Sequence, residues 1–206
     1  MKADATASNS STATRWRLWV DGCGGFLILT GDCWTLGAAV PGGVADVGIR
    51  ADVARHAGRI ERVDSDYFWR NNEADDLSDT GRSQSILISP KQPLPVAGSA
   101  TIRLRRPSTL SRTGVLILDP PHRFDGHVDA VIFAGDTILV GPSSDHHVVT
   151  SSFPDRAVLA YRDGGWQAKP LSQPGGKPGK SGPTFVELEL GRRIQIQSLA
   201  MTLERA

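Results

Sequence analysis

Five cationic and amide side chains of this sequence could bind an anion or a segment of another protein: Arg50, Arg55, His56, Asn71 and Asn72. A phosphate dianion needs a cation and several hydrogen-bond donors that are held in place before it arrives. Guanidinium, imidazole and amide groups supply both, and loops on a rigid scaffold can hold them. The competing interpretation is a set of solvated loop residues with local ion pairs.

No group of residues in the sequence predicts a catalytic site or a metal site. Adjacent side chains of a strand point to opposite faces and rarely chelate together, so we interpret Asp145-His146-His147 as a polar loop. The sequence has neither a Gly-x-Ser-x-Gly elbow nor a His-Glu-x-x-His pair. We therefore expect no catalytic residue, no metal site and no cofactor, and a protein that is not an enzyme.

The segments around these residues are typical of β-strands. Short apolar or alternating runs are bounded by Gly, Pro, Asp and Ser, and in the first half of the chain they cover 16–20, 26–29, 33–36, 45–49, 58–63, 67–69, 85–88 and 100–104. No helix of three turns is evident, and 22 Gly and 13 Pro argue against one. The sequence predicts an all-β fold.

The sequence also repeats itself. Asp21-Gly22 recurs 104 residues later as Asp125-Gly126, and at the same interval Gly31-Asp32 matches Gly135-Asp136. An apolar run lies between the two dipeptides in each copy. This pattern predicts an internal duplication: a tail over 1–14, a first β-sandwich unit over 15–106, a junction over 107–112 and a second unit over 113–206.

Two segments of the first unit resemble the forkhead-associated (FHA) domain family. Residues 34–38 (Trp-Thr-Leu-Gly-Ala) are similar to the strand that ends in Gly-Arg in that family. Residues 52–62 (Asp-Val-Ala-Arg-His-Ala-Gly-Arg-Ile-Glu-Arg) are similar to its Ser-Arg-x-His segment and the following strand. The chain resembles bacterial proteins with two tandem units of this kind. The resemblance implies two β-sandwiches whose loops at one end bind phosphothreonine peptides.

The residues with which the family binds phosphate are mostly replaced. Ala38 stands where the family has the Arg after Gly, and Ala54 stands where it has Ser. The family's structural His falls on Ala57, one residue after His56, whereas Asn71 and Asn72 lie near the place of its peptide-holding Asn. The loss of two charge-assisted contacts would weaken a micromolar binder by about two to four decades.

The second unit departs further from the family. Pro142 follows Gly141, and Phe153-Pro154-Asp155 replaces the second motif. We interpret this unit as a structural partner of the first, or as a surface for protein contact.

Composition narrows the class of partner. The formal net charge is +1, which gives no basic field for nucleic acid. Arg103, Arg105 and Arg106 are predicted to lie on an exposed strand face that lacks an aromatic platform. No apolar run reaches the roughly 20 residues of a membrane span, and residues 1–14 lack the apolar stretch of a secretory signal. Cys23 and Cys33 are expected to be reduced thiols in a cytoplasmic protein.

These observations together predict a non-catalytic protein–protein interaction module whose partner is another protein or a phosphothreonine peptide. Neither nucleic acid nor a membrane is expected as a partner. The alternative is a structural scaffold that binds no phosphopeptide.

Overall fold

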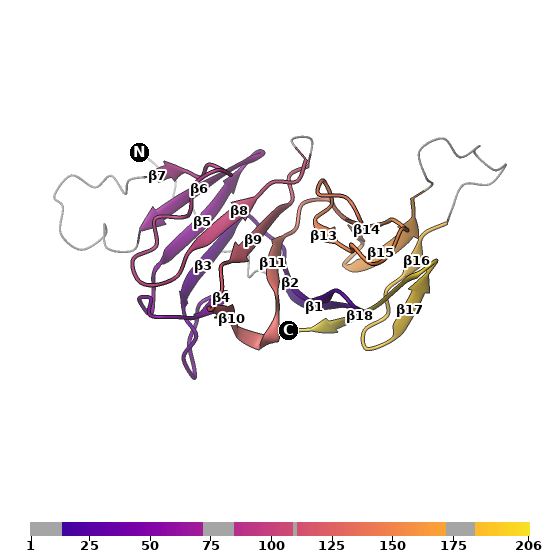
Figure 1. The fold of residues 1–206 in the computed structure, drawn as a ribbon, viewed down its shortest axis with the longest axis horizontal. Coiled ribbons are helices and arrows are strands. Elements are labelled where there is room, and N and C mark those ends of the chain that lie inside the picture. Colours follow the sequence, from indigo (N-terminus) through magenta and orange to yellow (C-terminus); the bar gives the residue numbers. More distant parts are fainter. Residues whose placement is uncertain (1–13, 72–84, 109–110, 172–183) are drawn as a thin grey trace, which may run out of the picture.

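A computed structural model describes residues 14–71, 85–108, 111–171 and 184–206 (Figure 1). These ranges contain strands and one short 3-10 turn, η2 (Asp125–His127), so the predicted all-β fold is confirmed. Within them no helix is long and apolar enough to cross a membrane.

The strands are short and several coincide with the apolar runs of the sequence. In chain order they are β1 (Arg15–Val20), β2 (Gly24–Leu29), β3 (Cys33–Ala38), β4 (Val47–Arg50), β5 (Gly58–Val63), β6 (Asp66–Asn71), β7 (Ser85–Leu87), β8 (Ile102–Arg105), β9 (Gly114–Leu118), β10 (Arg123–Phe124), β11 (Ala130–Phe133), β12 (Thr137–Gly141), β13 (Val148–Val149), β14 (Ala157–Arg162), β15 (Gly165–Pro170), β16 (Val186–Glu187), β17 (Arg193–Ile196) and β18 (Leu199–Arg205).

Seven of these strands form a middle sheet in the order β17-β18-β1-β2-β11-β9-β8. The central strands β2 and β11 run parallel, and their register pairs Phe26 with Ala130 and Leu29 with Phe133. The 104-residue interval of the sequence repeat therefore appears as a side-by-side pairing of two strands. Every other pair of neighbours in this sheet is antiparallel.

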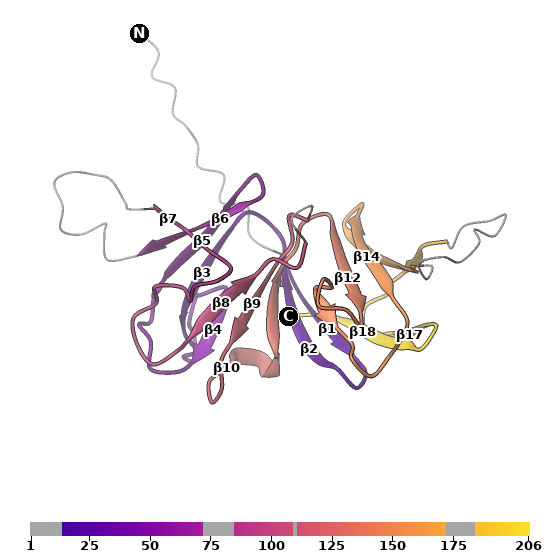
Figure 2. The same cartoon turned by 45° about the horizontal axis from the view of Figure 1, so that its top comes forward.

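Two outer sheets complete the molecule (Figure 2). The first outer sheet has the order β10-β4-β3-β5-β6-β7 and the second has the order β13-β12-β14-β15-β16. In both, a parallel pair (β3–β4, β12–β13) is followed by an antiparallel pair (β3–β5, β12–β14) and then by a hairpin (β5–β6, β14–β15). Apart from β10, the two outer sheets share one strand order and one set of strand directions.

The outer sheets pack against opposite faces of the middle sheet. Leu27 and Leu29 of β2 belong to the first core, under the first outer sheet. Phe26 and Ile28 of the same strand belong to the second core, under the second outer sheet. Both faces of β2 and β11 are thus covered, which explains why these two strands are continuous apolar runs rather than alternating ones.

The middle sheet draws strands from both predicted halves of the chain. It takes β1, β2 and β8 from residues 15–106, and β9, β11, β17 and β18 from residues 113–206. The division into two units at 107–112 stays a prediction, but strands from both sides of that boundary hydrogen-bond to one another in one sheet.

Arg62, a buried arginine of β5, forms hydrogen bonds with several strand connections. The Arg62 guanidinium donates hydrogen bonds to the carbonyl oxygens of Gly31 (2.7 Å), Ala134 (2.9 Å) and Arg112 (3.2 Å). It also pairs with Asp32 and lies over the ring of Trp34. Because Gly31 follows β2 and Ala134 follows β11, this one side chain fixes where both central strands leave the middle sheet.

Candidate functional site

The end of β3 positions the loop that carries two of the predicted site residues. A Cβ atom on Gly37 would lie 1.9 Å from the carbonyl oxygen of Arg55, so only glycine allows this loop to lie directly on the strand. The Ala38 N–H donates to the Ala54 carbonyl (3.0 Å), and the Ala57 N–H donates to the Leu36 carbonyl (2.9 Å). Residues 51–57 are therefore held by backbone contacts at the end of the first outer sheet.

The polar side chains of this loop are exposed, whereas Ala51, Val53 and Ala57 pack against the first core. Arg55 and His56 are exposed, and neither forms a hydrogen bond or an ion pair with side chains or backbone in the part of the chain that the structure describes. His56 lines a shallow pocket together with Asn71 at the end of β6. The Asn71 amide oxygen accepts a hydrogen bond from the Trp69 indole N–H, which orients the amide. We call residues 51–57 with Asn71 the open end.

The open end includes only some of the predicted site residues. The structure brings His56 and Asn71 together at one pocket, beside Arg55 in the same loop. Asn72 lies outside the described residues. Residues 95 and 97, a Pro and an Ala in the segment before β8, complete the pocket wall. The sequence analysis missed them, because nothing in their residue types distinguishes a pocket wall from an ordinary loop.

Arg50 does not join this group. It ends β4, where its Nε and Nη2 atoms donate to the Asp125 carboxylate at 3.0 and 2.7 Å. The hydrogen bond from Arg50 lowers the pKa of Asp125, so the pair is ionised at neutral pH. Arg50 lines a different pocket, beside Arg123 of β10 and the Pro120-Pro121 turn. Its charge is paired with Asp125, whereas that of Arg55 has no partner among the described residues.

The corresponding end of the second outer sheet is closed by two histidines. Residues 145–147 form a loop before β13, as predicted, but His146 and His147 are only 3% and 1% exposed, so both imidazoles are buried rather than solvated. A Cβ atom on Gly141 would lie 2.8 Å from His146 Nε2, which places an imidazole where Gly37 has a backbone carbonyl. We call residues 142–156 the sealed end.

His147 is held by hydrogen bonds on both of its ring nitrogens. Its Nδ1 accepts from the Leu139 N–H (2.8 Å), and its Nε2 lies 3.2 Å from Ser111 Oγ. Burial, with smaller contributions from Arg105 and His146, lowers its pKa to about 4. The imidazole is therefore neutral at physiological pH and acts as a structural hydrogen-bonding group.

Arg105 closes the sealed end from the neighbouring strand β8. Its guanidinium donates to the carbonyl oxygens of Ser144 (2.9 Å), His146 (3.0 Å) and His147 (2.8 Å). Arg103 binds both oxygens of Asp119, and Arg106 pairs with Asp66. The predicted alternation is present, since Ile102 and Leu104 are buried and Arg103 and Arg105 lie on the other, partly exposed side, but the arginines are bound to acceptors of the chain itself.

Phe153 and Asp155 of the sealed end also contact other parts of the protein. Phe153 packs against the second core, and its ring lies 3.3 Å from a Cβ atom that Gly22 would carry. The Asp155 carboxylate accepts from the Ser198 N–H (2.9 Å). Phe153 and Asp155 stand where the resemblance to FHA domains places the second motif. Phe153 thus contacts the protein interior, and Asp155 contacts a neighbouring strand connection.

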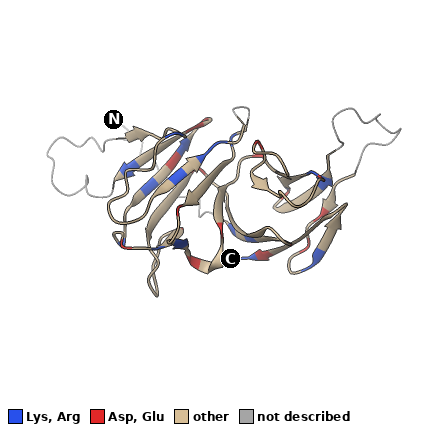
Figure 3. Cartoon of the chain, in the orientation of Figure 1, with Lys and Arg blue, Asp and Glu red and all other residues tan. Residues whose placement is uncertain are grey.

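Metal-ligand chemistry adds no further site in the part of the chain that the structure describes. Figure 3 shows that basic and acidic residues occur in both halves of the molecule. The described ranges hold no cluster of three or more His, Cys, Asp or Glu with the geometry of a metal site. Cys23 and Cys33 are free thiols, and burial is the main factor that raises the pKa of each. Four of the five tryptophans are buried, and Trp19 is half-buried with its N–H on Glu204.

Comparison with family models, with curated proteins and with solved structures found no significant match to this chain. Its function is therefore inferred from the two ends of the molecule.

Proposed function

We propose that this protein is a non-catalytic recognition module that binds a segment of another protein at the open end. The observation that carries the proposal is the state of Arg55 and His56. Both are exposed, both lie on a loop that backbone hydrogen bonds hold in place, and neither has an internal partner among the described residues. A fixed loop with unused donors is what a recognition surface requires.

The resemblance to FHA domains supports the same end. In that family the peptide-binding loops follow the strand that ends in Gly-Arg and precede the strand that begins after Ser-Arg-x-His. Here those positions fall on Gly37-Ala38 and on residues 54–57, which meet through the Ala38–Ala54 backbone hydrogen bond. The common strand order of the two outer sheets supports descent from one duplicated unit. We therefore propose two tandem FHA-like units, of which the first binds and the second supports.

We propose that this site depends less on phosphate for its affinity than the sites of FHA domains do. Ala38 and Ala54 provide neither the cation nor the hydroxyl of the family site. Arg55 is the cation that remains beside His56 and Asn71. One guanidinium with one amide is a weak phosphate site, because each missing charge-assisted contact removes about 1.5–3 kcal/mol. Protein contacts would then supply most of the affinity.

Isothermal titration calorimetry against a degenerate phosphothreonine peptide pool tests this proposal, with the unphosphorylated pool as control. We expect binding heat that is lost in Arg55→Ala and kept in Arg192→Ala, a variant of an exposed arginine near β17. A larger heat from the phosphorylated pool would place phosphate at Arg55. Absence of heat from both pools with wild-type protein would contradict peptide recognition at the open end.

A structural scaffold is the second candidate, and the arginine contacts favour it specifically. Arg62 and Arg105 donate six hydrogen bonds to backbone carbonyls of distant strand connections. Such contacts connect each outer sheet with the middle sheet, as a rigid scaffold would require. The two candidates differ in a simple measurement: a scaffold would bind its assembly equally well after Arg55→Ala and His56→Ala, whereas a recognition module would not.

A further inference from the structure

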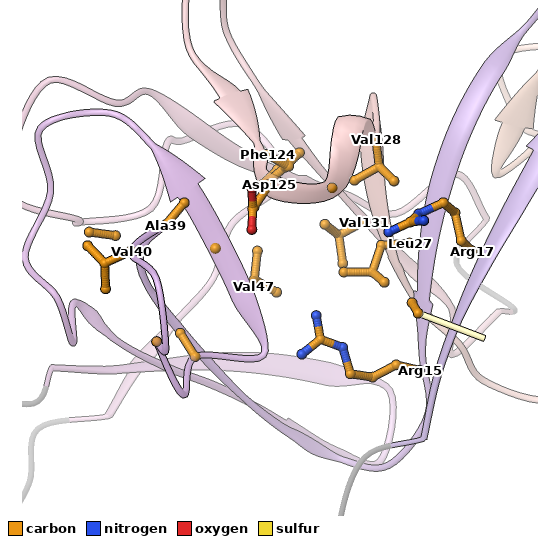
Figure 4. Close-up of a pocket in the computed structure, with 16 residues that line it drawn as sticks. Arg15, Arg17, Leu27, Ala39, Val40, Val47, Phe124, Asp125, Val128 and Val131 are labelled. Atoms are coloured by element: carbon orange, nitrogen blue, oxygen red, sulfur yellow. The ribbon is translucent and has the colours of Figure 1, made fainter. Parts of the chain in front are cut away.

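A cavity of about 160 Å³ lies between the middle sheet and the end of the first outer sheet (Figure 4). Leu27 of β2 and Val131 of β11 line it from the middle sheet, and Val47 lines it from β4. Phe124 and Val128, on either side of η2, contribute further apolar wall. None of its lining residues belongs to the pocket of the open end.

Two arginines of β1 face this cavity. Arg15 and Arg17 are alternate residues of one strand and so lie on the same face of the middle sheet. Arg17 is the cross-strand partner of Leu27. Figure 4 shows both guanidinium groups directed toward the space between Val47 and Val131. One side of the cavity is therefore cationic and the other is apolar.

Neither guanidinium has an anionic partner among the residues that the structure describes. Both side chains are half-buried, and in the described ranges neither forms an ion pair or a hydrogen bond. The Nε atoms of both are shielded from solvent and have no acceptor. Arg17 lies over the Trp19 ring, with its Cζ atom 5.9 Å from the ring centroid. A desolvated cation without an acceptor is unfavourable, so an incoming anion would be stabilised here.

The local charge stays positive when the acidic neighbours are included. Two carboxylates line the cavity beside the two arginines: that of Asp125, which is bound by Arg50, and the terminal one of Ala206, which forms no ion pair with either arginine. The arginine pair of β1 therefore retains its charge for a ligand. Guanidinium groups favour carboxylate and phosphate oxygens, because their planar N–H groups match two oxygens at once.

We propose that this cavity binds a small carboxylate with an apolar body, with the carboxylate on Arg15 and Arg17 and the apolar part against Leu27, Val47 and Val131. The size of the body follows from the volume, since an apolar cavity of about 150 Å³ accommodates a benzene molecule. The apolar wall favours such an acid over a bare inorganic ion. Ala38 lines the cavity and donates its N–H to the Ala54 carbonyl of the open end, so the two sites adjoin, but the proposed ligand binding does not depend on the proposed recognition function.

Methyl-detected NMR of the full chain locates the binding. Benzoate is the probe, and benzamide is its uncharged analogue of the same shape. We expect saturable benzoate shifts on the methyl groups of Leu27, Val47, Val128 and Val131, and affinity for benzamide at least tenfold lower. Equal affinity for the two probes, or shifts that avoid these methyl groups, would overturn the proposal. Phosphate binding without benzoate binding would also overturn it, because the apolar wall would then have no role.

Charge variants complete the test. Arg15→Met and Arg17→Met keep most of the apolar side chain and remove the cation, and each should weaken benzoate binding about tenfold or more. Arg55→Met, a change of the same type at the open end, should leave it unaltered. The dispersion of the methyl spectrum shows directly whether each variant is folded. Unchanged benzoate affinity in folded Arg15→Met and Arg17→Met would contradict the assignment, whatever happens to peptide binding.

Discussion

The open end and the sealed end follow the same strand pattern and differ in what covers the terminal glycine. At Gly37 the covering group is the backbone carbonyl of Arg55, and the Arg55 and His56 side chains are left in solvent. At Gly141 it is the imidazole of His146, and the neighbouring His147 is fully enclosed. The same residue type is thus exposed to solvent at one end and supports the fold at the other.

This difference shows that the location of a histidine, rather than its presence, decides its role. A buried imidazole must satisfy both nitrogens within the protein, and His147 does so with Leu139 and Ser111. An exposed imidazole has water as its partner and stays available. We therefore expect substitutions at the sealed end to change stability and substitutions at the open end to change binding.

The largest expected effect is that of His147→Ala. The change removes a buried side chain and leaves the Leu139 N–H without its acceptor. It should lower the free energy of unfolding by about 2–4 kcal/mol in urea denaturation. His56→Ala is the matched control at the open end and should change this value by no more than about 0.5 kcal/mol. Equal effects of the two substitutions would remove the distinction between the ends.

The same histidine should make stability depend on pH. Its folded-state pKa of about 4 lies below the ordinary value of 6.5, so from pH 6.5 to pH 4 the unfolded chain binds a proton that the folded chain does not. The free energy of unfolding should therefore fall by about 3 kcal/mol as the pH drops through this range, on account of this group. Denaturation series for wild type and His147→Gln would measure the difference. Parallel pH curves for the two proteins would contradict the assignment.

The next largest loss in the free energy of unfolding is expected for Arg105→Met. The variant loses the donors to three loop carbonyls and keeps the aliphatic part of the side chain. We expect a loss of about 1.5–3 kcal/mol in the free energy of unfolding. Arg103→Met, two residues earlier on the same strand, removes a partly exposed ion pair with Asp119 and should cost about 0–1 kcal/mol. Calorimetric unfolding of both variants would show whether the carbonyl contacts are the stronger of the two.

A smaller difference should separate Gly37→Ala from Gly141→Ala. At Gly37 the new methyl group would meet backbone, the Arg55 carbonyl, whereas at Gly141 it would meet side chains of His146 and Arg156 that can move. Both changes overpack the site, and we expect Gly37→Ala to be the more destabilising by about 1–2 kcal/mol. Thermal unfolding compares them. A larger loss for Gly141→Ala would mean that the sealed end is the more rigid contact.

The sequence was sufficient for the class of fold. Alternating and continuous apolar runs predicted β1 to β6 closely, and residues 58–63 coincide with β5. The 104-residue repeat identified β2 and β11 as corresponding strands of the two copies. It did not indicate that the two strands are neighbours in one sheet. Pairing between strands so distant in the chain, such as β1 with β18, depends on complementary surfaces that no local pattern encodes.

The candidate site was predictable only in part. The loop with Arg55 and His56 followed from the motif, and Asn71 lies beside it. The engagement of Arg50 by Asp125 was not foreseeable, because the two residues are 75 positions apart. Nor was the burial of His146 and His147, since polar residue types in a short run resemble an exposed loop until the position of Arg105 is known.

The most direct test of the proposed function introduces at the open end the two residue types with which FHA domains bind phosphate. Ala38→Arg with Ala54→Ser puts a guanidinium and a hydroxyl on two positions that share a backbone hydrogen bond. If the open end has the geometry of a phosphopeptide-binding end, calorimetry should show phosphothreonine-dependent affinity raised by about two to four decades over wild type. Ala38→Met with Ala54→Ser should not show it. A folded double variant that binds phosphorylated and unphosphorylated pools alike would contradict the account.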